Sequence, residues 1–221
     1  MFRTHLHLHR MQLLLAGLLA LLLNGCFGGG NQRLEPAVYD LFGSVSGSIG
    51  NADPAEPVTG LTLRLAEVQA PAWLNTPAMQ YRLTYAEPAQ RLVYAESRWA
   101  APPAELLEQL VRRQDVVRRS RYEAGGCQLH LNLDEFIQIF DAPGSSRALI
   151  EVQVALLAPG NTRPIARQSF RMAPAAGGEA KSGVAGFVIA ARDLGKELNI
   201  WLLRVQRETP DVAALCHSEA P

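Results

Sequence analysis

The second half of the sequence changes from an apolar period of two residues to a helical period, and this change constrains the fold more than any other feature. Apolar and polar side chains alternate over residues 127–140, 150–156 and 165–172, and short turns rich in proline and glycine separate these segments. Such alternation is typical of half-buried strands, and three strands joined by short turns predict an antiparallel meander. Over residues 184–205 the apolar side chains recur at helical spacing, which predicts one long helix that Ser182 caps.

The first half of the chain adds shorter elements of both kinds. Segments 36–42, 61–65 and 79–85 alternate like strands, and the last of them is expected to form a hairpin with residues 92–94. Pro102-Pro103 then introduces an amphipathic helix, because proline is tolerated in a first helical turn. Together these patterns predict an α+β fold. It is a two-layer sandwich in which a mostly antiparallel or mixed sheet of about six strands carries two long helices on one face.

The N-terminus resembles an export signal followed by a lipid attachment site. Met11–Leu23 is apolar and uncharged, follows a basic start, and is shorter than the about 20 apolar residues that span a bilayer. Leu22-Leu23-Asn24-Gly25-Cys26 resembles a bacterial lipobox, whose cysteine is lipidated and becomes the mature N-terminus. We therefore expect a signal peptide over residues 1–25, a lipidated Cys26 with a flexible tether over 26–35, and a single periplasmic domain over 36–221.

The residue after Cys26 bears on which membrane holds the anchor. In bacterial lipoproteins an aspartate at this position favours retention in the inner membrane, whereas this chain has Phe27. The resemblance therefore implies an anchor in the outer membrane, on its periplasmic face. Several acyl chains on one cysteine would hold the protein stably, because a single chain gives only marginal attachment.

Two cysteines remain once Cys26 is assigned to the lipid. Cys127 and Cys216 form an even pair in a chain that is expected in an oxidising compartment. We therefore predict a disulfide between them. The bridge would connect the tail that follows the long helix to the start of the meander.

The sequence offers no group of residues that predicts catalysis or nucleic-acid binding. The chain has 21 basic and 21 acidic residues, a balance that gives no electrostatic footprint for nucleic acid. His130 falls on the polar phase of a strand, and the adjacent Asp134 and Glu135 are expected to mark a β-bulge, because the apolar phase shifts there. We expect no catalytic residue, no metal site and no cofactor, and we therefore expect that the protein is not an enzyme.

A loop between two predicted strands carries a candidate for partner binding. Trp73 and Leu74 lie between Pro71 and Pro77, and the two prolines should stiffen the loop. Tryptophan is enriched among residues that dominate binding energy, so this loop is expected to contact a partner. The alternative is that Trp73 folds back as a lid on the sheet, and the sequence leaves both readings open.

Several short motifs occur in an order that resembles a known family. They are Tyr39-Asp40-Leu41, the segment Pro71–Tyr85, Arg98-Trp99-Ala100, Arg167-Gln168-Ser169-Phe170, and the helical segment Val188–Leu202. This order resembles the auxiliary lipoproteins of ABC-type transport systems. The similarity covers most of residues 37–205.

The resemblance implies a role and no chemistry. Family members look like outer-membrane-anchored periplasmic partners of inner-membrane ABC transporters that use substrate-binding proteins of the mammalian-cell-entry type. Such systems move lipids or hydrophobic molecules and maintain the envelope. Docking of the Trp73 loop onto further copies of this chain, in a homo-oligomeric ring, is the alternative to docking onto the transporter. Two alternatives are a structural or assembly lipoprotein without a transporter, and a periplasmic module that binds lipid itself.

Overall fold

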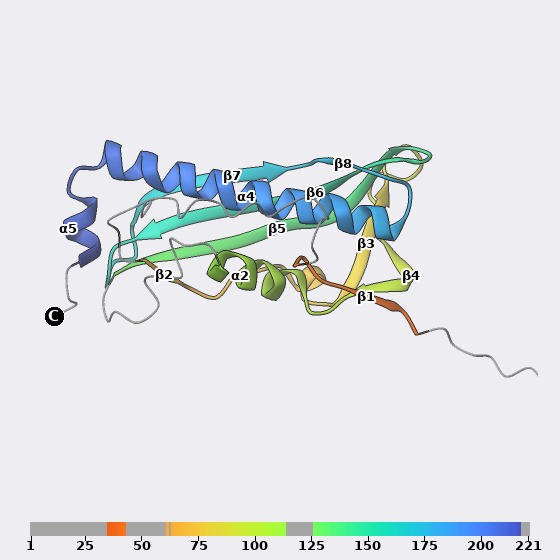
Figure 1. Ribbon diagram of the computed structural model, residues 1–221, viewed down its shortest axis with the longest axis horizontal. Coiled ribbons are helices and arrows are strands. Elements are labelled where there is room, and N and C mark those ends of the chain that lie inside the picture. Colours follow the sequence, from red (N-terminus) through yellow and green to blue (C-terminus); the bar gives the residue numbers. More distant parts are fainter. Residues whose placement is uncertain (1–34, 43–60, 62, 114–125, 218–221) are drawn as a thin grey trace, which may run out of the picture. The chain divides into compact units, whose positions relative to one another are not determined.

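One mixed β-sheet forms the framework of the protein. The computed structural model describes residues 35–42, 61, 63–113 and 126–217. The described residues from Pro36 onward belong to one compact unit, Pro36–Pro221. Its strands, shown in Figure 1, are β1 (Ala37–Tyr39), β2 (Leu63–Leu65), β3 (Ala78–Leu83), β4 (Leu92–Trp99), β5 (Cys127–Ala142), β6 (Ser145–Leu157), β7 (Pro164–Met172) and β8 (Ala175–Ala176). The order across the sheet is β1-β4-β3-β5-β6-β7, while β2 pairs with β5 and β8 pairs with β6.

The helices differ greatly in length. They are the 3-10 helix η2 (Ala72–Leu74), α2 (Pro103–Arg113), the long α4 (Ala180–Glu208) and the short α5 (Val212–His217). Helix α4 runs along β6 and β7 and contacts both strands (Figure 1). Within the described ranges, no helix combines the length and the apolar character needed to cross a membrane.

The sheet is mixed, and the expectation of a mostly antiparallel sheet is wrong. Among the described strands, β1 runs parallel to β4, and both β2 and β3 run parallel to β5. For β3 and β5 the physical reason is that the chain between them reverses twice, first in the hairpin with β4 and then on the way through α2, so that it returns beside β3 in the original direction. The two predicted antiparallel units are present: β3 pairs with β4 as a hairpin, and β5, β6 and β7 form the meander.

The β-bulge that the sequence predicts lies in β5. Its pairing with β6 shifts register between Leu133 and Glu135, so that Asp134 is the additional residue. Before the bulge the odd-numbered residues from Cys127 to Leu133 are buried, and after it Phe136 joins the same core. The bulge therefore keeps one apolar face continuous along a strand of 16 residues.

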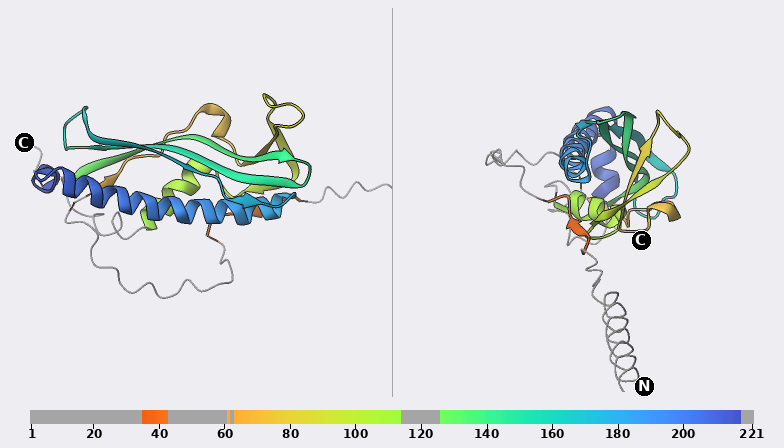
Figure 2. Two further views of the ribbon diagram at one scale, coloured as in Figure 1. Left: turned by 90° about the horizontal axis from the view of Figure 1, so that it is seen from above. Right: turned by 90° about the vertical axis from the view of Figure 1, so that its right-hand side faces the viewer.

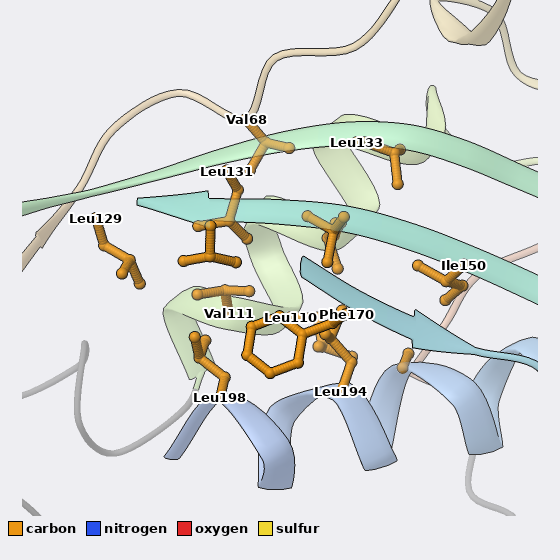
Figure 3. Packing of buried hydrophobic residues seen from close by; sticks show 14 of the residues in the cluster. Val68, Leu110, Val111, Leu129, Leu131, Leu133, Ile150, Phe170, Leu194 and Leu198 are labelled. Carbon is orange, nitrogen blue, oxygen red and sulfur yellow. The ribbon is translucent and has the colours of Figure 1, made fainter. Parts of the chain in front are cut away.

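Buried side chains of both longer helices join one core with those of the strands. Figure 3 shows this packing, with α4 below the strands and α2 behind them. The labelled residues are Leu110 and Val111 of α2, Leu194 and Leu198 of α4, Leu129, Leu131 and Leu133 of β5, Ile150 of β6, Phe170 of β7, and Val68. Phe136 stacks on Phe187, with ring centroids 4.3 Å apart, and Trp99 packs edge-on against both. That the two helices lie on the same face of the sheet stays a prediction.

The start of α4 differs in one detail from the sequence expectation. Glu179 is the N-cap residue, and Ser182 is the third helical residue of a reciprocal capping box. The Ser182 hydroxyl accepts a hydrogen bond from the backbone N–H of Glu179 at 3.1 Å. Ser182 therefore stabilises the helix start, although from inside the first turn.

Cys127 and Cys216 are joined by a disulfide in the structure. Both cysteines are fully buried, and their Cα atoms are 4.7 Å apart. The bond links the start of β5 to α5, across 89 residues of sequence. The predicted signal peptide, Cys26 and all but the last residue of the tether lie outside the described residues.

Candidate functional site

Helix η2 holds one apolar side chain inside the fold and leaves its neighbour outside. The Leu74 backbone N–H donates to the carbonyl of Pro71 at 2.9 Å, which closes the single turn. Leu74 is 1% exposed and belongs to the main core, whereas the side chain of Trp73 is 54% exposed. The buried leucine thus anchors the turn that carries the exposed tryptophan.

Contacts from Gln80 of β3 and from Arg91, the residue before β4, fix the position of Trp73. The Gln80 side chain donates a hydrogen bond from Nε2 to the backbone carbonyl of Trp73 at 2.6 Å. The guanidinium carbon of Arg91 lies 5.7 Å from the centroid of the Trp73 ring, within the range of a cation–π contact. Arg91 also donates from Nη1 to Gln80 Oε1 at 2.9 Å, so the same glutamine connects both residues.

Glu135 at the β-bulge fixes Arg91 in turn. Its carboxylate accepts two hydrogen bonds from Arg91, 3.0 Å from Nη1 and 2.5 Å from Nη2. Glu135 is only 8% exposed, so this bidentate pair is shielded from water and is stronger than an exposed ion pair. Arg82 Nη2 lies 3.5 Å from the same carboxylate. One carboxylate therefore faces two guanidinium groups.

These residues form one surface, which we call the Trp73 surface and which comprises Trp73, Gln80, Arg82, Arg91, Val93 and Glu135. Val93 pairs with Gln80 across the hairpin and is exposed. In both views of Figure 2, η2 and α4 lie on opposite sides of the strands. The register agrees for Arg82. Gln138 lies against Gly183 of α4, whereas its neighbour Ile139, the partner of Arg82, faces the other side of β5.

The structure separates the two residues that the sequence proposed as a partner-binding pair. Leu74 is part of the core and is not available to a partner, so its assignment to the binding loop is wrong. Because Trp73 is 54% exposed, it does not close over the sheet as a lid. The buried residue of the turn is its neighbour Leu74. The residues that remain candidates for contact with a partner are therefore Trp73 and its polar neighbours.

Sequence reasoning missed Arg82, Arg91 and Glu135 as members of this site. Arg82 was visible only as a polar residue of an alternating strand, and Glu135 only as part of the bulge. The three meet because β3 runs parallel to β5, with Arg82 paired to Ile139. A single alternating pattern carries no information about which strand lies beside it, so no signal in the sequence could have grouped them.

The other polar residues singled out from the sequence have structural partners. His130 lies 3.0 Å from Gln128 Oε1 through its Nε2 atom, and Asp134 accepts a hydrogen bond from Gln153 at 2.9 Å. Among the residues that the structure describes, no group of three or more His, Cys, Asp or Glu is placed to hold a metal ion.

A depression of about 330 Å³ lies on β5, β6 and β7. Polar side chains dominate its lining, which comprises Asn132, Gln153, Val154, Ala155, Arg167, Gln168 and Ser169. Ligand pockets for apolar molecules are lined mainly by apolar and aromatic side chains. This depression therefore does not favour a module that binds lipid by itself.

Comparisons with known proteins identify a family and a related fold. The family model described as the ABC-type transport auxiliary lipoprotein component matches residues 46–199, well over half of the chain. A crystal structure of a Xanthomonas campestris protein from a domain family of unknown function is similar, with a TM-score of 0.65 and 22% identity, over 79% of this chain and 99% of that one. This likeness shows that the fold is shared.

Two further crystal structures are more distant. One is of an uncharacterized protein, with a TM-score of 0.48 and 14% identity over 77% of this chain and 97% of that one. The other is of a Caulobacter crescentus protein described as a lipoprotein, with a TM-score of 0.33 and 14% identity over 45% of this chain and 82% of that one. No curated protein matches the sequence.

Proposed function

This chain belongs to the family of ABC-type transport auxiliary lipoprotein components, and we propose that it serves such a system by docking, through the Trp73 surface, onto a periplasmic component of the transporter. A family of this kind is not an enzyme type. On this proposal the protein acts by binding a partner. Binding at the Trp73 surface is therefore the property to test.

The proposal has finer parts that the sequence motivates. Residues 1–25 direct export, Cys26 carries the lipid, residues 26–35 form the tether, and residues 36–221 form the periplasmic domain. The anchor lies in the outer membrane, because Phe27 follows the cysteine. The partner is a substrate-binding protein of the mammalian-cell-entry type, on an inner-membrane ABC transporter that moves lipids or other hydrophobic molecules.

The observation that carries the docking proposal is an exposed tryptophan in a rigid setting. Trp73 is 54% exposed although Leu74, Gln80 and Arg91 hold its backbone and its ring in place. A side chain that is already ordered loses little conformational entropy when a partner covers it. Large aromatic residues of this kind often contribute about 2 kcal/mol or more to binding.

Replacing Trp73 by alanine should remove binding and keep the fold. We expect the Trp73→Ala chain to lose co-purification with a substrate-binding protein of the mammalian-cell-entry type from the same organism. Its melting temperature should stay nearly unchanged, because the side chain packs little in the core. Ile200→Ala is the matched control, since Ile200 is an exposed apolar residue on α4 and its removal should leave binding intact.

Two results of this experiment would contradict the proposal. One is a Trp73→Ala chain that binds the transporter component as well as the parent chain. The other is a clear fall in melting temperature with binding intact in the folded fraction, which would make Trp73 a structural residue. If the parent chain instead associates only with its own copies through Trp73, the surface is the interface of a homo-oligomeric ring and the transporter partner is refuted.

Replacing Cys26 by serine tests the anchor independently. The Cys26→Ser chain has no thiol at the expected lipidation site, so it should lose acyl labelling and should no longer fractionate with the outer membrane. Metabolic labelling with a fatty acid, followed by separation of the two membranes on a density gradient, measures both. Normal labelling of the Cys26→Ser chain, or a parent chain found in the inner membrane, would rule out the proposed anchor.

A further inference from the structure

The charges around Trp73 indicate what kind of segment docks there. We propose that the Trp73 surface binds an acidic peptide segment of the partner, with an apolar side chain against Trp73 and Val93 and a carboxylate at Arg82. This inference rests on the proposed function, because it describes the partner segment at the same surface. It adds a chemical class that the family assignment does not supply.

The positive charge of the surface exceeds its negative charge by one. Its positive charges are Arg82 and Arg91, and its negative charge is Glu135. Both carboxylate oxygens of Glu135 accept a hydrogen bond from Arg91. Arg82 reaches the same carboxylate only at 3.5 Å. Its Nε atom is buried and has no hydrogen-bond partner among the described residues. Arg82 is thus the guanidinium with the weaker internal partner.

A carboxylate is the group that suits such a guanidinium. The Arg82 side chain is 22% exposed, so part of it remains within reach of a partner. Arginine presents its donors in a planar fork that matches the two oxygens of a carboxylate, and charge-assisted hydrogen bonds of this kind are strong. An aspartate or glutamate of the partner would also offset the excess positive charge.

The apolar part of the surface fits a single side chain rather than a membrane. Trp73 and Val93 are the exposed apolar residues of the surface, and both flank Gln80. Peripheral binding to anionic lipid usually needs a cluster of several lysines or arginines beside a larger apolar face. One excess charge and two apolar side chains are better matched to a short acidic segment of a protein.

The test measures binding of the full-length lipidated chain, in detergent, to a purified periplasmic probe. The probe is the purified periplasmic domain of a substrate-binding protein of the mammalian-cell-entry type from the same organism. Arg82→Gln should weaken binding about ten-fold, the effect of one charge-assisted contact. Arg82→Lys should weaken binding less than Arg82→Gln does, because lysine keeps the positive charge. The control Arg207→Gln removes an exposed charge from α4 and should bind like the parent chain.

Salt gives a second measurement that needs no variant. Raising sodium chloride from about 50 to about 300 mM should weaken binding of the parent chain several-fold, because salt screens exposed charges. The affinity of the Arg82→Gln chain should fall less over the same range of salt, because one of the screened charges is absent. A parent chain whose affinity is independent of salt would overturn the acidic segment.

The outcomes separate this inference from the proposed function. If Trp73→Ala abolishes binding while Arg82→Gln binds like the parent chain, docking stands and the acidic segment is refuted. If the parent chain does not bind the probe at all, the proposed function fails and this inference fails with it. If Arg82 instead governs binding to vesicles of phosphatidylglycerol and phosphatidylcholine in a 3:7 ratio, the surface contacts anionic lipid and the peptide segment is refuted.

Discussion

Gln138 is a buried polar residue in β5 whose amide is fully engaged. It donates to Ser146 Oγ at 2.8 Å and to the carbonyl of Gly177 at 2.9 Å, and it accepts a hydrogen bond from the Tyr94 hydroxyl at 3.0 Å. Burial raises the pKa of Tyr94 to about 12, so the phenol keeps the proton that it donates. Buried polar groups of this kind are stable only while all partners remain in place.

Gly183 of α4 lies directly against this amide, and replacing it by alanine should destabilise the protein. An added Cβ would lie 2.0 Å from Gln138 Oε1 and would displace the hydrogen-bonded side chain. We expect Gly183→Ala to lower the free energy of unfolding by about 1–3 kcal/mol, although alanine favours a helix over glycine by about 1 kcal/mol. Urea denaturation measures the change.

The control for Gly183→Ala lies in the same helix. Lys181 is exposed in the first turn of α4, so Lys181→Ala should change stability by less than about 0.5 kcal/mol. A Gly183→Ala chain as stable as the parent, or more stable, would show that α4 does not need to approach β5 this closely.

At the level of single residues, the sequence indicated which side chain could bind a partner, but it did not indicate which side chains are in contact. It identified Trp73 as the candidate for binding, because a tryptophan between two prolines is conspicuous in a loop. It could not assign Leu74 to the core, since neighbouring loop residues carry no periodicity that separates inside from outside. It also could not identify Glu135 as the partner of Arg91, which is 44 residues away along the chain.

At the level of elements, the hairpin, the meander, the bulge and the long helix follow from local patterns. The parallel pairings do not, because alternation looks the same in parallel and antiparallel neighbours. Strand β5 is long enough to take two short parallel partners on one edge, β2 at Cys127–Leu129 and β3 at Gln138–Phe140. This division of one edge is what brings Arg82 beside Glu135.

The disulfide also acts between elements, because it connects the first residue of β5 to α5. Cys127 opens the strand and Cys216 lies in α5, which follows the long helix. The α5 residue Val212 is also buried in the main core. The bond therefore adds a covalent link where α5 already packs against the sheet.

At the scale of the whole domain, the two sides of the sheet have different roles in this account. Helix α4 packs along one side and completes the main core, whereas η2, which carries Trp73, lies on the other side (Figure 2). The α4 side holds the main core. A second, smaller buried cluster of Ile137, Ile139 and Leu149 lies apart from it, and Ile139 pairs with Arg82 of the Trp73 surface. The central claim is that a transporter component covers Trp73.

Tryptophan fluorescence tests this claim most directly, because the chain has three tryptophans and they differ sharply in exposure. Trp73 is 54% exposed, whereas Trp99 and Trp201 are 2% and 3% exposed. Acrylamide should therefore quench mainly Trp73, and a Trp73→Phe chain should show little quenching at any stage. The proposed partner is the periplasmic domain of a substrate-binding protein of the mammalian-cell-entry type, prepared without tryptophan. Adding it should protect the parent chain to nearly the level of Trp73→Phe. A complex that forms while Trp73 stays fully quenchable would contradict the account.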